Sequence, residues 1–228
     1  MINFIKKNIL ILIYSLIELV ICILLLTKLT DNVNILRYSL IIINFIASIV
    51  ILVFSRSKRS VYFCISFFFI CLADYGLIIL GDNYELSVTY FIFAQLALMI
   101  MMKIKKLELL IRLILIIVLE VVSVLVCKDL YSVLVFVTMI YLSTFISNIT
   151  FGIIKKENIV FIIGMILFIM CDICVGIANF SLFTNEKLVE ICEKLIFMFY
   201  IPGLYLMVIG TYINEIIRGV VCKKEKDI

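Results

Sequence analysis

The stretch Gly164-Met-Ile-Leu-Phe-Ile-Met-Cys-Asp172 ends in an ionisable side chain that lies deep inside a long apolar run. A second aspartate has a similar position 98 residues earlier, at the end of Phe67-Phe-Phe-Ile-Cys-Leu-Ala-Asp74. Each run is long enough to cross a bilayer, which takes about 20 residues of helix. Inserting a charged side chain at the centre of such a helix costs about 2.5–3.5 kcal/mol, so intramembrane charges are rare and usually functional. The two aspartates are therefore the first candidates for a functional site.

The composition extends this reading to the whole chain. Of its 228 residues, 66% are hydrophobic and only 16% are charged, and the mean hydropathy is +1.31. This balance excludes a water-soluble domain and predicts an all-α, polytopic membrane helix bundle that forms one integral membrane domain over 1–228. The formal net charge of +4 gives no reason to expect a nucleic-acid partner.

Histidine is absent from the sequence. Its absence excludes Ser-His and Cys-His catalysis and histidine metal sites, so acid–base chemistry would fall to Asp, Glu, Tyr, Lys or Cys. Cys171-Asp-Ile-Cys174 has the spacing of a C-x-x-C motif, but partner ligands are lacking and we interpret these cysteines as small apolar packing residues. Neither a metal nor another cofactor is expected.

Eight transmembrane helices are expected, over about 8–27, 35–54, 61–80, 86–102, 109–127, 130–150, 158–178 and 194–216. Of the 20 Lys and Arg residues, fifteen fall on one side of these spans and five on the other. The positive-inside rule then predicts a multi-pass protein of the plasma membrane with both termini in the cytoplasm. Arg37 and Arg112 lie near span ends and are expected to extend to the interface. The Ile-, Lys- and Asn-rich composition without Trp is typical of an AT-rich bacterial genome.

The intramembrane carboxyls occur at matched positions in the two halves of the chain. Asp74 and Asp172 each lie about 14 residues past the start of their spans, so both should lie about 21 Å into the bilayer. Glu18 and Glu120 lie near the middle of the first and fifth spans. This pattern predicts a duplicated four-helix unit, over about 1–105 and 106–228, with parallel repeats about an axis along the membrane normal.

The single proline, Pro202, lies in the eighth span and is expected to kink it by freeing the carbonyl of Met198. Two interpretations of the kink stay open. It is either a packing feature or part of the lining of a cavity at the depth of Asp172. In the second case Tyr200 and Tyr205 are candidates to hydrogen-bond the buried carboxyls.

Two aspartates that meet inside a helix bundle should hold one proton between them and titrate as a pair. Such a pair supplies a general acid and a general base without histidine. The alternative is that each buried carboxyl is protonated and only hydrogen-bonds a neighbouring helix. That alternative applies to Glu18 and Glu120 as well as to the aspartates.

The two aspartate motifs resemble those of the YhhN-like lysoplasmalogenase family. Gly164–Asp172 is similar to the family's G-x-x-L-F-x-x-S-D signature, and Phe68–Leu77 is similar to its S-x-x-G-D-x-x-L motif. The length, the eight spans and the two halves are similar as well. The chain departs from the family pattern where glycine, serine, histidine and glutamine are replaced by Ala73, Cys171, Gln95 and Gly203.

The resemblance implies an enzyme that hydrolyses the vinyl-ether bond of lysoplasmalogens and releases a fatty aldehyde and a glycerophospho-headgroup. Asp74 and Asp172 would be its catalytic acid and base, with the two roles unassigned. The residues expected to contact the lysophospholipid substrate are Gln95, Tyr200, Tyr205, Glu18 and Glu120. Two alternatives remain, namely a non-catalytic lipid-binding or scaffolding relative and a proton-coupled transporter.

Overall fold

The computed structural model describes residues 2–26, 33–81, 83–128, 131–179 and 186–218. This part of the chain is helical and contains no β-strand, which confirms the all-α class. Its α-helices are α1 (Ile2–Leu26), α2 (Val33–Ser55), α3 (Lys58–Asp74), α4 (Tyr84–Met101), α5 (Lys106–Cys127), α6 (Val133–Ile154), α7 (Ile159–Asn179) and α8 (Glu186–Tyr212). Two π-helical segments, η1 (Tyr75–Leu80) and η3 (Ile213–Arg218), continue α3 and α8.

Seven of these helices, α2 to α8, are long and apolar enough to cross a membrane. The first helix contributes a shorter apolar stretch, Ile9–Leu25. Large apolar side chains cover the outward faces of the helices, as Leu12, Ile117 and Val126 illustrate. In water this surface would be unfavourable, whereas in a bilayer it faces lipid. The chain is therefore a membrane-embedded, polytopic helix bundle.

The helix bounds agree with the expected spans within a few residues, except at the starts of the first and last helices; α1 begins at Ile2 and not near 8. The last helix begins at Glu186 and not near 194, because its first turns are charged and hydropathy alone does not detect them. Lys194 and Glu190 form an i,i+4 ion pair at 2.6 Å in this part. The expected end of the first span at 27 and the expected start of the sixth at 130 lie outside the described residues.

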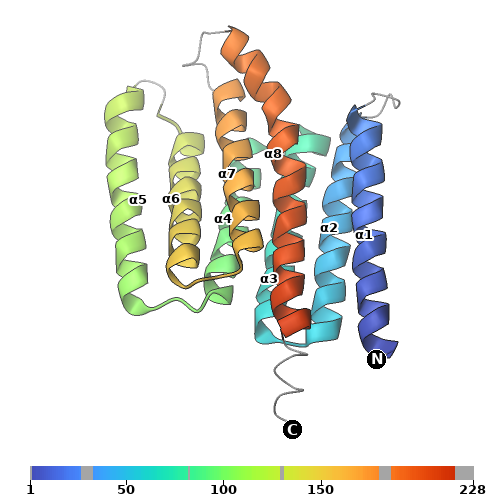
Figure 1. The fold of residues 1–228 in the computed structure, drawn as a ribbon. Coiled ribbons are helices and arrows are strands. Elements are labelled where there is room, and N and C mark those ends of the chain that lie inside the picture. Colours follow the sequence, from blue (N-terminus) through green and yellow to red (C-terminus); the bar gives the residue numbers. More distant parts are fainter. Residues whose placement is uncertain (1, 27–32, 82, 129–130, 180–185, 219–228) are drawn as a thin grey trace.

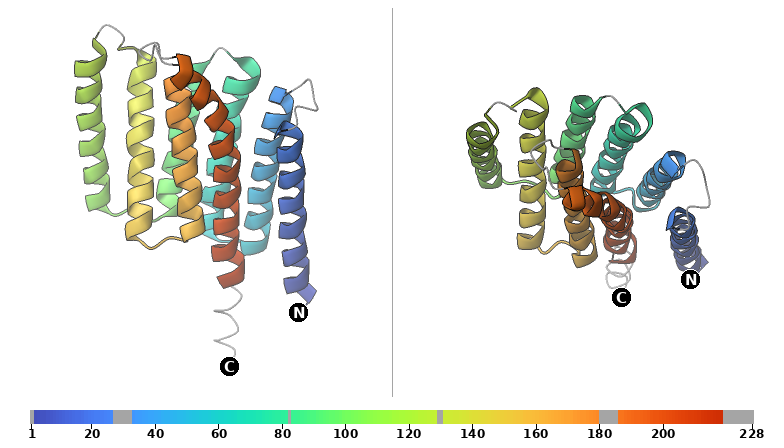
Figure 2. Two further views of the ribbon diagram at one scale, coloured as in Figure 1. Left: turned by 45° about the horizontal axis from the view of Figure 1, so that its top comes forward. Right: turned by 90° about the horizontal axis from the view of Figure 1, so that it is seen from above.

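The helices run alternately up and down beside one another, with α1 and α5 at opposite lateral edges of the bundle (Figures 1 and 2). The most extensive contacts join α7 to α8 and α3 to α4, and these four helices form the centre. Next to them, α2 packs on α3 and α8, and α6 packs on α4 and α7. The outermost helices, α1 and α5, pack chiefly on α2 and α6 respectively.

Glycines bring α7 and α8 into backbone contact. A Cβ atom added at Gly164 would lie 2.6 Å from the Met207 nitrogen, and one added at Gly210 would lie 2.4 Å from the Phe161 nitrogen. Small residues at a helix interface are typical of membrane bundles, where close van der Waals packing drives association. Further along, α8 continues through Pro202 without ending, and the helix is bent in Figure 1.

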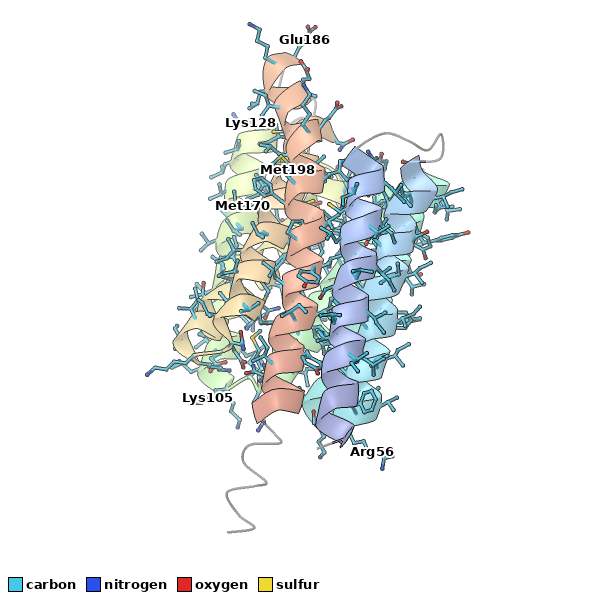
Figure 3. The ribbon with its side chains drawn as sticks, turned by 45° about the vertical axis from the view of Figure 1, so that its right-hand side comes forward. Arg56, Lys105, Lys128, Met170, Glu186 and Met198 are labelled. Atoms are coloured by element: carbon cyan, nitrogen blue, oxygen red, sulfur yellow. The ribbon has the colours of Figure 1, made fainter. Side chains whose placement is uncertain are left out.

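The two ends of the bundle differ in charge. The α2–α3, α4–α5 and α6–α7 connections lie at one end, where Figure 3 shows Arg56 and Lys105. We call this the basic end because its connections and helix starts carry Arg56, Lys58, Arg59, Lys103, Lys105, Lys106, Lys155 and Lys156. Lys128 and Glu186 lie at the opposite end (Figure 3).

Candidate functional site

Asp74 is the last residue of α3 and is enclosed by the bundle, with 4% of its surface exposed. Its Oδ2 accepts a hydrogen bond from the hydroxyl of Tyr200 on α8. Directly after Asp74 the backbone widens into the π-helical segment Tyr75–Leu80. Such π-helical turns are rare and occur often at functional sites. The hydrogen bond to Tyr200 confirms one of the two tyrosine contacts expected from the sequence.

Asp172 lies in α7 and is half-buried. Its Oδ2 accepts a hydrogen bond from the hydroxyl of Tyr141 on α6. Tyr141 is buried and was not among the residues predicted from the sequence. The depth of Tyr141 in the membrane could have pointed to this contact. Tyr141 lies eight residues into α6, and Asp172 lies seven residues before the end of α7. With the two helices antiparallel, these positions correspond to about 10–12 Å from the same end.

The two aspartates and their two tyrosines form one group, which we call the acid cluster. Asp172 lies within electrostatic range of Asp74. Tyr141 and Tyr200 each lie within electrostatic range of both aspartates. The ring of Phe168, one turn before Asp172, packs edge-on against Tyr200 with 5.4 Å between centroids. The acid cluster is thus held by α3, α6, α7 and α8 together.

Nearer the basic end, residues at the start of α3 contact residues at the start of α7. The residues of each contact are 98 positions apart in sequence, as Asp74 and Asp172 are. Arg59 donates to Glu157 at 3.0 Å and 2.5 Å, 98 positions further on. Phe63 and Phe161, again 98 positions apart, have ring centroids 6.4 Å apart. Arg59 Nε also lies 3.3 Å from Glu215 of η3, which fastens the end of α8 to the same ion pair.

Gln95 lies in a second polar group, separate from the acid cluster. It is fully buried in α4, and its Oε1 accepts from Asn148 Nδ2 of α6 at 2.9 Å. Asn148 Oδ1 in turn accepts from Arg112 Nη1 at 2.7 Å. The expectation that Arg112 extends to the interface is therefore wrong. Its side chain turns inward and is only 4% exposed, because Asn148 and the Thr144 carbonyl accept its hydrogen bonds.

Glu18 and Tyr205 belong to a third polar group, between α1, α2 and α8. Glu18 is buried and accepts from Asn44 Nδ2 at 2.6 Å. The Tyr205 hydroxyl lies 2.8 Å from Ser15 Oγ, so the expected bond from Tyr205 to a carboxyl is wrong. The reason is geometric, since residues five apart on a helix point about 140° away from each other. Tyr200 therefore faces α3 while Tyr205 faces α1.

Glu120 lies apart from all three groups. It is half-buried on α5, and its Oε2 accepts from the Tyr131 hydroxyl at 2.9 Å. Because α5 packs on α6 at one edge of the bundle, Glu120 does not reach the acid cluster. The cysteines Cys171 and Cys174 are buried and unbridged. Within the described ranges, no three His, Cys, Asp or Glu side chains lie close enough together to hold a metal ion.

The fold and the acid cluster define a membrane-embedded helix bundle with a pair of carboxyl groups buried between its helices. In comparisons with known proteins, no family model, no curated protein and no solved structure matches the chain.

Proposed function

We propose that the chain is a membrane-embedded hydrolase that cleaves the vinyl-ether bond of lysoplasmalogen-type lysophospholipids, as the resemblance to the YhhN-like lysoplasmalogenase family implies. The observation that carries the proposal is the acid cluster, in which Tyr200 donates a hydrogen bond to Asp74 and Tyr141 donates one to Asp172. Both tyrosines lie within electrostatic range of both aspartates. Within the described residues, the Oδ1 atom of each carboxyl accepts no hydrogen bond. Each aspartate thus keeps one oxygen for a substrate or a water molecule.

Vinyl-ether hydrolysis needs an acid and a base at one place. A protonated aspartate gives its proton to the outer vinyl carbon, which leaves an oxocarbenium ion beside the ether oxygen. The ionised aspartate stabilises this cation and takes a proton from the water that adds to it, as carboxylate pairs do in glycosidases. The resulting hemiacetal collapses to a fatty aldehyde and the free glycerol hydroxyl. One water molecule is consumed, and the aspartate pair regains its single proton.

The difference in exposure between the aspartates suits a lipid substrate. Asp74 is enclosed, whereas Asp172 is half-buried and more accessible. A single-chain lipid can enter such a site sideways from the bilayer, with its tail among the apolar helix faces and its headgroup nearer the water. Tyr141 and Tyr200 act as positioning residues, since each fixes one oxygen of an aspartate.

We further propose eight spans with both termini in the cytoplasm of a bacterial cell, in the plasma membrane. The basic end supports this orientation, because positively charged connections face the cytoplasm. The acid cluster then lies in the outer half of the bilayer. The terminal residues 1 and 219–228 lie outside the described residues.

The helix contacts support the proposed duplication into halves of about 1–105 and 106–228. The packing of α1 on α2, α2 on α3 and α3 on α4 is repeated by α5 on α6, α6 on α7 and α7 on α8. The contact of α4 with α6 is repeated by that of α8 with α2. Two parallel halves related by a two-fold axis bring equivalent residues face to face at the axis, and pairs 98 positions apart meet in this way between α3 and α7.

An aldehyde-release assay tests the proposed hydrolase. Purified protein in detergent receives a 1-alkenyl lysophosphoethanolamine, and the corresponding 1-alkyl ether, which cannot be protonated at a vinyl carbon, serves as the substrate control. Aldehyde from the alkenyl lipid alone, with none from Asp172→Asn, is the expected result. Lipid binding without aldehyde would instead identify a non-catalytic lipid-binding or scaffolding protein.

A proton-coupled transporter is the second candidate, and the contacts between α3 and α7 favour it. The Arg59–Glu157 ion pair, the Phe63–Phe161 contact and the acid cluster follow one another along these two helices. In a transporter, the ion pair and the aromatic contact would close the solute path at the basic end, and the acid cluster would be the proton-binding site deeper in the membrane. Solute uptake into vesicles that depends on a proton gradient, without aldehyde release, would identify this function.

A further inference from the structure

The proposed hydrolysis gives no role to the buried guanidinium of Arg112. Only its Nη1 is engaged, by Asn148 Oδ1 at 2.7 Å and by the Thr144 carbonyl at 3.4 Å. The ring of Phe151 lies beneath the guanidinium, with 5.1 Å between the Arg112 Cζ atom and the ring centroid. Nε is buried and has no partner, and Nη2 forms no hydrogen bond to any described residue.

The edge formed by Nε and Nη2 is the part of an arginine side chain that binds two oxygens of a phosphate or carboxylate at once. No described carboxylate takes this position. Glu108, one turn earlier on α5, acts on Arg112 electrostatically, but its Oε2 is paired with Lys155 at 2.6 Å. Arg112, Lys155 and Glu108 together leave one positive charge without a counter-charge. Such a charge is costly inside a membrane protein.

The hydrogen bonds around Arg112 also point to a ligand rich in acceptors. A guanidinium can only donate, so the Asn148 Oδ1 must accept and its Nδ2 must donate. Asn148 Nδ2 donates to Gln95 Oε1 at 2.9 Å, which leaves the Gln95 Nε2 as a buried donor without a partner. The unpaired groups in this network, Arg112 Nε and Gln95 Nε2, are both donors. An anion would satisfy donors of this kind and also balance the charge.

The place of Arg112 in the bundle indicates where an anion would come from. Arg112 lies six residues into α5, about 9 Å from the helix start at the basic end. Lysines surround this corner of the bundle in the connections on either side, namely Lys103, Lys105, Lys106, Lys155 and Lys156. Basic pockets between membrane helices at such a level bind anionic lipid headgroups. A headgroup from the leaflet would approach between α4 and α5, which each pack on α6 without comparable contact between themselves.

We propose that the Nε–Nη2 edge of Arg112, supported by Asn148 and Gln95, binds a phosphate group at the basic end, and that an anionic phospholipid of the adjoining leaflet supplies it. This site is separate from the acid cluster and does not depend on the proposed hydrolysis. The same phosphate chemistry is available from free inorganic phosphate, and the experiment distinguishes the two sources.

Native mass spectrometry of the full-length protein is the first arm. The protein is purified from membranes that contain phosphatidylglycerol and phosphatidylethanolamine. Arg112→Lys keeps the charge but loses the two-donor edge, and Arg112→Gln loses both. Arg56→Gln removes one charge from an exposed position at the same end and is the control. Bound phosphatidylglycerol should fall about tenfold in both Arg112 variants and stay unchanged in the control.

The second arm measures the Tm of the wild type in neutral phosphatidylcholine nanodiscs. This arm uses the wild type alone, so it does not depend on whether the Arg112 variants fold. A rise in Tm with phosphatidylglycerol but not with inorganic phosphate supports the lipid source. A rise with inorganic phosphate alone supports the Arg112 site but overturns the lipid source. The absence of both shifts, or equal retention of phosphatidylglycerol by the wild type and both Arg112 variants, overturns the site. If Arg112→Lys retains phosphatidylglycerol fully and Arg112→Gln does not, the charge alone binds the lipid and the proposed role of the two-donor edge is wrong.

Discussion

Arg59 at the start of α3 and Glu157 just before α7 form a double hydrogen-bonded ion pair, at 3.0 Å and 2.5 Å, across 98 positions of sequence. The same interval separates Phe63 from Phe161, whose rings are in contact. It also separates Asp74 from Asp172. These two pairs bring the start of α3 against the start of α7, and Asp74 and Asp172 follow further along the same two helices.

Replacement of either aspartate tests the acid pair directly. We expect Asp74→Asn and Asp172→Asn each to lower the rate of aldehyde release by about 10²–10⁴-fold, the usual contribution of general acid–base catalysis. Asparagine has almost the same shape, so the protein should still insert and elute as the wild type in size-exclusion chromatography. Glu85→Gln makes the same chemical change at an exposed position of α4 and should keep full activity. Wild-type rates in both aspartate variants would disprove the catalytic role.

Removal of the tyrosine hydroxyls should weaken the reaction without ending it. Tyr200→Phe removes the hydrogen bond that the hydroxyl donates to Asp74, and Tyr141→Phe removes the one donated to Asp172. A hydrogen bond to a charged group contributes about 1.5–3 kcal/mol, so we expect a loss of about 10- to 100-fold in kcat. Tyr62→Phe, which removes a hydroxyl from α3 that bonds no described residue, is the control. An equal effect of all three replacements would mean that the hydroxyls do not act through the aspartates.

Charge reversal tests whether Arg59 and Glu157 depend on each other. Arg59→Glu places a third carboxylate beside Glu157 and Glu215 and should lower Tm in detergent clearly. Glu157→Arg should also lower Tm, through repulsion with Arg59. The double variant restores an opposite-charge pair, so its loss should be smaller than the sum of the single losses, with a coupling of about 0.5–3 kcal/mol. Strictly additive losses would show that the two residues are not coupled.

The close packing of α7 on α8 makes a prediction about glycine. Gly164→Ala would place its Cβ 2.6 Å from the backbone nitrogen of Met207, so the two helices must separate. We expect a loss of about 1–3 kcal/mol in the free energy of unfolding, as for other overpacked sites. Gly176→Ala, in the same helix, meets no atom within 4 Å and should stabilise the protein by about 0.5–1 kcal/mol. Similar effects of the two replacements would rule out the backbone contact as the cause.

Much of the fold could be predicted because the membrane imposes it. Apolar runs about 20 residues long have to be helices in a bilayer, so hydropathy located the helices and placed Asp74 and Asp172 inside them. The start of α8 at Glu186 was missed because its first turns are charged and carry no hydropathy signal.

The directions of single side chains could not be predicted in the same way. Tyr141 donates to Asp172, Arg112 turns inward to Asn148, and Tyr205 contacts Ser15 of α1. Each of these contacts depends on how a helix is rotated about its own axis and on which helix lies beside it. Apolar residues occur on all sides of these helices, so hydropathy alone gives little information about rotation.

The opposite charges of Arg59 and Glu157 have a consequence for the history of the chain. If both halves descend from one four-helix ancestor that paired with itself, a single aspartate codon would have supplied both Asp74 and Asp172. An ancestral residue at the position of Arg59 and Glu157 would have faced its own copy, and two arginines or two glutamates there would repel. On the proposed duplication, the acid pair can be as old as the ancestral dimer, whereas the opposite charges of Arg59 and Glu157 can arise only after two copies exist and diverge.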